Sequence, residues 1–209
     1  MIAIIDYDTG NTKSVSKALT YLGMENEITA DADKIISADG VILPGVGAFK
    51  IAMAEIKRRN LIDPINQAVA NHTPLLGICL GMQLLFETGY EFGVTKGLGL
   101  IPGNVVPIPQ QPGFKIPHVG WDDNRLVKPD PIGAEFENQF TYFVHSYYVD
   151  TPAENIVAIN DYGKVQIPSV VRQENVIGIQ FHPEKSSRVG LNGLAKFKEV
   201  VDNASNSSN

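Results

Sequence analysis

The only cysteine of the chain lies between two glycines, where one apolar segment ends and another begins. Residues 77–81 (GICLG) have the pattern G-x-C-x-G, which is typical of a nucleophile on a tight turn between a strand and a helix. Glycine on both sides allows neighbouring backbone to pass close to that turn. A helix beginning after Cys79 points free N–H groups at the sulfur and favours the reactive thiolate. The N–H of Leu80 is then placed to donate to an oxyanion on a substrate.

A histidine and a glutamate near the other end of the chain have the spacing of a catalytic pair. His182 and Glu184 are two residues apart, so in an extended segment both side chains point to the same side. Pro183 between them restricts the backbone and favours that conformation. A thiolate needs a base that moves protons, and the base needs an acceptor that fixes its tautomer. These residue types therefore predict a Cys-His-Glu triad, and an acid that follows the histidine disfavours the chain order of α/β hydrolases.

A glycine-rich loop could supply a second donor to the oxyanion. Residues 43–49 (LPGVGAF) follow a predicted buried strand, at the end where open α/β sheets gather their sites. One such donor typically contributes about 10²–10³ in rate. Each pattern also has an ordinary explanation: a buried apolar cysteine, a surface turn at His-Pro-Glu, and a plain turn closing a strand–helix unit. Their occurrence together favours catalysis.

Composition narrows the class of protein. The chain has 209 residues, 44% apolar and 19% charged, which is ordinary for one soluble globular domain. A net charge of −6 without a basic stripe disfavours a nucleic-acid partner. One cysteine excludes an internal disulfide, and the four scattered histidines have no metal-ligand spacing, so we expect no metal and no cofactor. With no signal peptide or membrane-spanning apolar run, we expect a cytoplasmic protein that does not bind membranes.

Strand and helix patterns alternate through the first ninety residues. Buried strands are predicted over residues 2–7, 40–45 and 74–79, with helices over 12–23, 48–60 and from 80 onward. This alternation predicts an α/β fold with an open, mostly parallel central sheet and helices on both faces. The C-terminal half predicts a smaller antiparallel or mixed portion. In it, residues 103–121 are rich in Pro and Gly and are expected to form a loop or short irregular strands, and closely spaced strands follow from residue 140.

A series of motifs across nearly the whole chain resembles class I (triad) glutamine amidotransferases. Within that family the motifs are most similar to the glutamine amidotransferase subunits of imidazole glycerol phosphate synthase. YFVHSYY and HPEKSS are the most specific, because other triad amidotransferases usually vary there. In chain order the motifs are IDYDTGN, PGVGAF, LGICLGMQLLF, GLGLIPG, KIPHVGW, YFVHSYY and GIQFHPEKSS. The resemblance implies a single amidotransferase domain over residues 1–202, and the polar residues 203–209 are expected to be a disordered tail.

The resemblance implies a glutaminase that works with a second protein. Cys79 attacks the side-chain amide of glutamine, His182 moves the proton from the thiol to the leaving ammonia, and Glu184 orients His182. Ammonia then passes through a tunnel in a cyclase partner, a (β/α)₈ barrel with which the subunit forms a heterodimer. There it reacts with a ribulosyl aminoimidazole carboxamide nucleotide to give imidazole glycerol phosphate and an aminoimidazole carboxamide ribonucleotide, a step of histidine biosynthesis.

Further site residues are implied by their matched positions in the family. The peptide near Val46 points away from the oxyanion until the partner binds its nucleotide, so the chain alone is expected to be nearly inactive. The implied oxyanion donors are Val46, Gly47 and Leu80, the substrate-binding residues are Gln83, Gly47, Ser146 and Tyr147, and the residues facing the cyclase are Asn11, Trp121 and Lys185.

The chain departs from the family pattern at two positions toward the expected partner face. Asp8 stands where Gly is usual, and Asp122 stands where Asn follows the tryptophan. Two other hypotheses stay open at this point. One is a triad amidotransferase that feeds ammonia to a different synthase, which YFVHSYY disfavours. The other is a non-enzymatic redox sensor built on the same cysteine, which has no need of the His-x-Glu pair.

Overall fold

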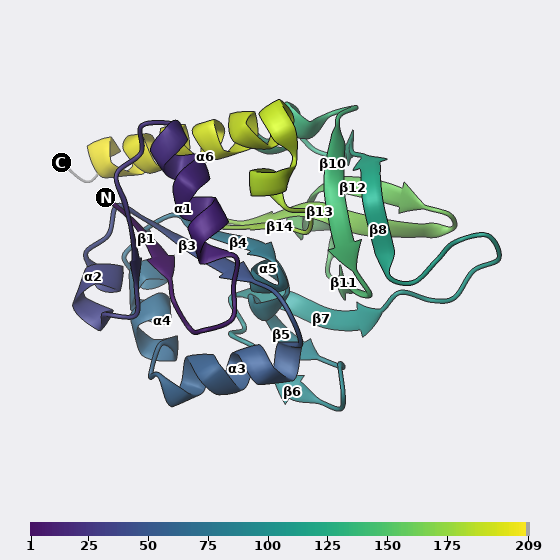
Figure 1. The fold of residues 1–209 in the computed structure, drawn as a ribbon, viewed down its shortest axis with the longest axis horizontal. Helices are drawn as coiled ribbons and strands as arrows, with labels where there is room; N and C mark the ends of the chain where they lie inside the picture. The colour runs from purple at the N-terminus through teal and green to yellow at the C-terminus, as the bar shows by residue number, and fades with distance from the viewer. Residues whose placement is uncertain (208–209) are drawn as a thin grey trace.

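Residues 1–207 are described by the computed structural model, which has an α/β fold built on one large sheet (Figure 1). The eight strands have the order β2-β1-β3-β4-β14-β13-β12-β9. The first five in this order are parallel and the last three pair antiparallel, so the predicted fold class is confirmed. The strands are β1 (Ile2–Ile5), β2 (Asn26–Thr29), β3 (Gly40–Gly45), β4 (Leu75–Cys79), β9 (Arg125–Leu126), β12 (Ile156–Tyr162), β13 (Val165–Gln173) and β14 (Val176–Ile179).

The parallel strands are apolar without interruption because helices cover both of their faces. In β1, Ala3 and Ile5 belong to the core on one face, and Ile2 and Ile4 belong to the core on the other. On the first face lie α2 (Ala32–Ile36), α3 (Phe49–Arg58), α4 (Ile62–Ala70) and α5 (Leu80–Leu84), and on the second lie α1 (Thr12–Tyr21) and α6 (Ser187–Ser207) (Figure 1). No helix within residues 1–207 is long and apolar enough to cross a membrane.

Two smaller sheets extend the C-terminal half beyond the large one (Figure 1). One pairs β8 (His118–Asp123) antiparallel with β10 (Phe140–His145), so that His118 lies opposite His145. The other contains β11 (Tyr147–Asp150), β7 (Ile101–Pro107), β5 (Phe86–Gly89) and β6 (Thr95–Lys96), and the short 3₁₀ helices are η1 (Gly133–Phe136), η2 (Ala153–Asn155) and η3 (Pro183–Lys185). Parts of β7 and β8 fall within residues 103–121, where a loop or short strands were expected.

The helix after the cysteine is much shorter than its apolar pattern suggests. α5 has five residues, and the chain then enters β5, which pairs with β7 from Phe86 onward. Its apolar residues therefore face a second sheet rather than a longer helix. So short a helix contributes the free N–H groups of its first turn but little macrodipole.

The prediction of a disordered polar tail is wrong for residues 203–207, because α6 continues as far as Ser207. Val201 is buried in the core, and the hydroxyl of Ser205 donates to the Val201 carbonyl at 3.1 Å. The helix thus runs on through its own hydrogen bonds after its core contacts end. Residues 208 and 209 lie outside the described residues.

Close backbone packing fixes the turn between β4 and α5. β3 and β4 are parallel neighbours, with Gly45 opposite Cys79. A Cβ atom on Gly81 would lie 1.8 Å from the carbonyl oxygen of Leu43, and one on Gly77 would lie 2.7 Å from the carbonyl oxygen of Gly81. The first turn of α5 therefore rests directly on the backbone of β3.

We expect Gly81→Ala to lower the free energy of unfolding by about 3 kcal/mol, because backbone rather than a side chain must move. Gly10→Ala is the control, since a Cβ there meets the Pro44 carbonyl oxygen at an ordinary 3.4 Å. Its effect should stay within about 1 kcal/mol. Urea unfolding of both variants measures the difference, and equal losses would contradict the packing argument.

Candidate active site

Cys79 occupies a strained backbone conformation at the end of β4. Its φ is 55° and its ψ is −112°, a region that residues with side chains rarely adopt. The thiol is free and buried. Its sulfur lies 4.0 Å from the carbonyl oxygen of Val144 and 3.9 Å from the amide nitrogen of Gln180. This conformation is the sharp strand-to-helix turn expected of a nucleophile elbow.

The predicted base and its acceptor reach the cysteine because β14 lies next to β4. The two strands are parallel, with Ile179 opposite Ile78, so the segments that follow them meet at one edge of the sheet. His182 Nδ1 lies 2.8 Å from Glu184 Oε1, and both side chains are almost wholly buried. An extended segment was predicted here, but the segment is not extended throughout, because Glu184 lies in η3. This single turn still brings the carboxylate onto the imidazole.

Burial and hydrogen bonding oppose each other at this pair. Burial disfavours the imidazolium, but hydrogen bonds with Cys79 and Glu184 outweigh it and raise the pKa of His182 to about 9. At Glu184, burial raises the pKa, while hydrogen bonds from His182 and Asn11 and the imidazolium charge bring it below its usual value. The site therefore favours an imidazolium held between the Cys79 sulfur and the Glu184 carboxylate, the state from which His182 can give up a proton.

A cavity of about 380 Å³ opens beside the cysteine. Most of the site residues predicted from the sequence line this cavity, and they come from the elbow, the glycine-rich loop and the β10–β11 junction. Trp121 is not among its lining residues, and Glu184 and Asn11 lie behind His182. The lining residues are Val46, Gly47, Cys79, Leu80, Gln83, Glu91, Pro117, Val144, His145, Ser146, Tyr147, His182 and Lys185.

The predicted Gln83 is paired with Gln180, which sequence reasoning missed, and the two amides connect the cavity with the thiol. The amide nitrogen of Gln83 donates at 3.0 Å both to the Tyr147 carbonyl and to Gln180 Oε1. Gln180 in turn places its own amide nitrogen toward Cys79. Since both N–H groups of Gln83 are engaged, its carbonyl oxygen is the atom suited to a ligand in the cavity. Gln180 could have been found, because it precedes His182 by two residues and so shares its side of the chain.

The glycine-rich loop is anchored near its start, at Pro44. The buried hydroxyl of Tyr7 donates to the Pro44 carbonyl at 2.7 Å, and burial strongly raises the pKa of that phenol. Beyond this anchor Val46 is 41% exposed, and Gly47 has a φ of 93° with open space where a Cβ would lie. The loop thus has a buried base and an exposed tip.

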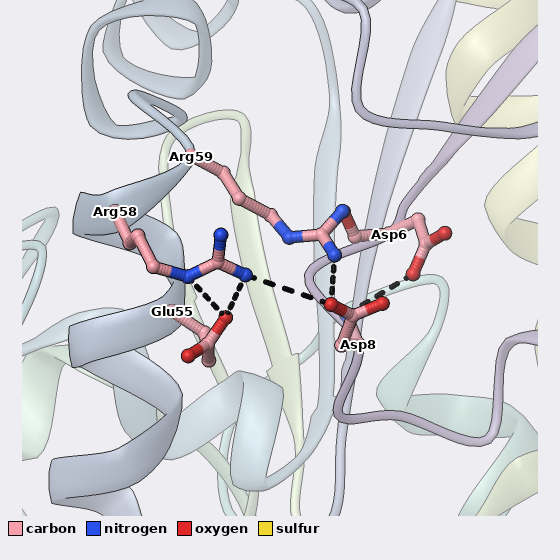
Figure 2. Close-up of polar contacts among 5 residues, drawn as sticks. All are labelled: Asp6, Asp8, Glu55, Arg58 and Arg59. Carbon is pink, nitrogen blue, oxygen red and sulfur yellow. Dashed lines mark hydrogen bonds and ion pairs between the residues drawn. The ribbon is translucent and has the colours of Figure 1, made fainter.

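The segment that carries Asn11 is tied to the end of α3 by an ionic cluster (Figure 2). Asp8 has a φ of 66°, which Asp tolerates better than most residues. Its carboxylate pairs with Arg59 and lies 3.6 Å from Arg58, which also binds Glu55. At the far end of the segment, the amide of Asn11 donates to Glu184 Oε1 at 3.0 Å. Asn11 therefore contacts the triad directly, a role that the sequence did not suggest.

Within residues 1–207, no group of three or more His, Cys, Asp or Glu side chains is arranged to hold a metal ion. The chemistry that this site can perform with its own residues is nucleophilic attack by Cys79 and proton transfer by His182.

Comparison with known proteins shows which family this chain matches. Residues 3–199 match the family described as glutamine amidotransferase class-I. The chain is 55% identical over 202 residues to the imidazole glycerol phosphate synthase subunit HisH of Lacticaseibacillus casei (strain BL23), covering 97% of each chain. It is 52% identical over 209 residues to the same subunit of Lactiplantibacillus plantarum, covering all of both.

A solved structure shares the fold at much lower identity. A chain of the PurLQS structure from Thermotoga maritima is 21% identical, with a TM-score of 0.72 and 97% of each chain covered. The family match spans nearly the whole chain, including the elbow, the glycine-rich loop and the His-x-Glu segment. This protein belongs to the class I glutamine amidotransferase family.

Proposed function

We propose that this chain is the glutaminase subunit of an imidazole glycerol phosphate synthase, and that it hydrolyses glutamine to glutamate and ammonia for histidine biosynthesis. One observation carries the proposal: Cys79, His182 and Glu184 meet beside a cavity of about 380 Å³, in a chain that is more than half identical to subunits of that name. Those relatives do not favour a different synthase, and a redox sensor has no use for the buried pair.

The reaction follows from the positions of the three residues. The Cys79 thiolate attacks the side-chain carbonyl carbon of glutamine, and a carbon–sulfur bond forms as the carbonyl oxygen becomes an oxyanion. His182 carries the proton taken from the thiol and gives it to the nitrogen as the carbon–nitrogen bond breaks, which releases ammonia. Water activated by His182 then hydrolyses the γ-glutamyl thioester, while Glu184 holds the ring in one orientation.

The remaining cavity residues hold the substrate and its developing charge. The backbone N–H groups of Leu80 and of the Val46–Gly47 peptide donate to the oxyanion. Gln83 offers its carbonyl oxygen to the substrate, and the backbone of Ser146 and Tyr147 lines the other wall. Because Val46 lies on the exposed tip of the loop, its peptide is suited to switch into place only when a partner binds.

The partner is a cyclase subunit with a (β/α)₈ barrel, which docks over the outer face of β8 and β10. This face carries exposed apolar side chains where the opposite face is buried, a pattern typical of a protein interface. Lys185 and Val144 lie where this face meets the cavity, so ammonia leaves toward the partner. The outer face is formed by Val119, Trp121, Phe140 and Val144. We place the complex in the cytoplasm, where the cyclase receives ammonia through a channel.

Glutamate release should be nearly undetectable for the chain alone and should rise about 10²–10³-fold with the cyclase and its nucleotide ligand, since one oxyanion donor is worth that much. The complex with Cys79→Ala is the control and should stay inactive while remaining folded. Full activity without the cyclase would leave the triad in place and refute gating by the loop. Activity in the Cys79→Ala complex would refute the nucleophile.

Trp121→Ala should weaken binding of the cyclase about tenfold or more, because a large aromatic residue at the centre of an interface often dominates its affinity. Tyr21→Ala is the matched control, since Tyr21 is 79% exposed at the end of α1, away from β8 and β10. Calorimetric titration of the cyclase measures both. Equal affinities for the two variants would mean that the partner docks elsewhere.

The pKa shifts predict how the stability of the triad depends on pH. Because the pKa of His182 is raised from 6.5 to about 9, its imidazolium stabilises the fold fully below 6.5, and this contribution is lost as pH rises through about 9. Glu184, with a lowered pKa, stays ionised across that window. The unfolding free energy of wild type relative to Glu184→Gln should therefore fall by about 1–2 kcal/mol between about pH 6 and pH 10. Parallel pH profiles from urea titrations would show that the carboxylate does not support the imidazolium.

A further inference from the structure

Two buried histidines outside the triad form a continuous chain of polar contacts with Asp122 and Tyr147. His118 Nε2 lies 3.2 Å from Asp122 Oδ2, and His118 Nδ1 lies 3.1 Å from His145 Nε2. His145 Nδ1 lies 2.8 Å from the carbonyl oxygen of Tyr147. Both histidines are at least 94% buried, so water cannot take the place of these partners.

The partners at each end determine where the protons lie. A carbonyl oxygen only accepts, so His145 must carry its proton on Nδ1. Burial, which outweighs the other influences, lowers the pKa of His145 to about 3, so the ring is neutral and its Nε2 is an acceptor. His118 Nδ1 must then be the donor. The carboxylate of Asp122 lies 3.2 Å from the other ring nitrogen, Nε2.

The ring of His118 is held in place by its neighbours. It stacks between two aromatic rings, at a centroid distance of 4.7 Å and an angle of 19° to Phe143, and 4.1 Å and 28° to Tyr162. Two stacked rings and the neighbouring carboxylate of Asp122 therefore fix the orientation in which Nδ1 of His118 faces His145.

The series of polar contacts ends at the Tyr147 carbonyl, which also binds Gln83 in the substrate cavity. The Tyr147 oxygen accepts from His145 Nδ1 and also from the Gln83 amide, so both of its lone pairs are used. Gln83 in turn binds Gln180, whose amide lies against the Cys79 sulfur. A change in the tautomer of His145 would replace a donor by an acceptor facing Tyr147 and would release this carbonyl.

We propose that His118, through the N–H of its Nδ1, is a positioning residue that fixes the tautomer of His145 and thereby the Tyr147 carbonyl and Gln83 of the glutamine cavity. The proposal rests on the proposed function for the identity of the ligand.

Nitrogen-15 correlation spectra of the full-length chain test the protonation state without any activity measurement. The proton of His145 should lie on Nδ1 in wild type, and it should be shared with Nε2 in His118→Phe, which lacks the donor to Nε2. Asp123→Asn is the control, because Asp123 is exposed and its side chain points to the other side of β8. A His145 protonated on Nε2 in wild type, or an unchanged tautomer in His118→Phe, would overturn the proposal, whether or not the chain proves to be a glutaminase.

Kinetics of the complex with the cyclase separate positioning from packing. His118→Phe keeps a stacked ring but loses the donor, so KM for glutamine should rise about fivefold with kcat changed less than about twofold. His118→Asn loses the ring but keeps an N–H near the place of Nδ1, so its KM should return toward the wild-type value. If His118 only fills space, the order reverses and His118→Asn is the worse variant. A reversed order, or a KM unchanged in His118→Phe, would refute the positioning role.

Discussion

The close packing of the first turn of α5 on β3 is the constraint on which the site depends. Cys79 adopts a positive φ that costs about 1–3 kcal/mol for a residue with a side chain. The chain tolerates this because Gly81 lies against the Leu43 carbonyl with no room for a Cβ, and Leu80 and Met82 are buried beside it. Burial of each such side chain contributes about 1.5–3 kcal/mol, enough to hold the turn. The same packing aims the thiol at the edge of the sheet.

Every other group of the site is positioned relative to that edge. β14 pairs with β4 and so delivers His182, while β3 delivers the glycine-rich loop on the other side. Hydrogen bonds then hold the side chains around these groups. Asn11 donates to Glu184, and Gln83 donates to both Gln180 and the Tyr147 carbonyl. The backbone pairs and hydrogen bonds of the site are thus largely buried, whereas the loop tip at Val46 is exposed.

Much of the fold and the triad could be predicted because both depend on local patterns. The unbroken apolar run of β4 and the flanking glycines indicated the elbow, and the spacing of His182 and Glu184 indicated the pair. The end of α5 could not be predicted, since Phe86 leaves the helix only because β7, distant in the chain, offers a strand to pair with. The tail was misjudged because its polarity hid a helix that continues through its own hydrogen bonds.

The polar contacts behind the triad could not be predicted from the sequence for a similar reason. His118 and His145 face each other only through the register of β8 and β10, and Asn11 meets Glu184 only after β1 and β14 join one sheet. Composition and spacing carry no information about such pairs. Asp8 shows the converse case, because its departure from the usual Gly is explained once its positive φ and its ion pairs with α3 are known.

The central claim, that Cys79 is the nucleophile of this cavity, can be tested by covalent trapping. The complex with the cyclase would be treated with a glutamine analogue that has an electrophilic carbon in place of the side-chain amide, digested, and examined by mass spectrometry. The account predicts one added analogue per chain, on the peptide that contains Cys79, and loss of glutaminase activity in proportion. Loss of activity with that peptide unmodified, or an adduct on another residue, would contradict it.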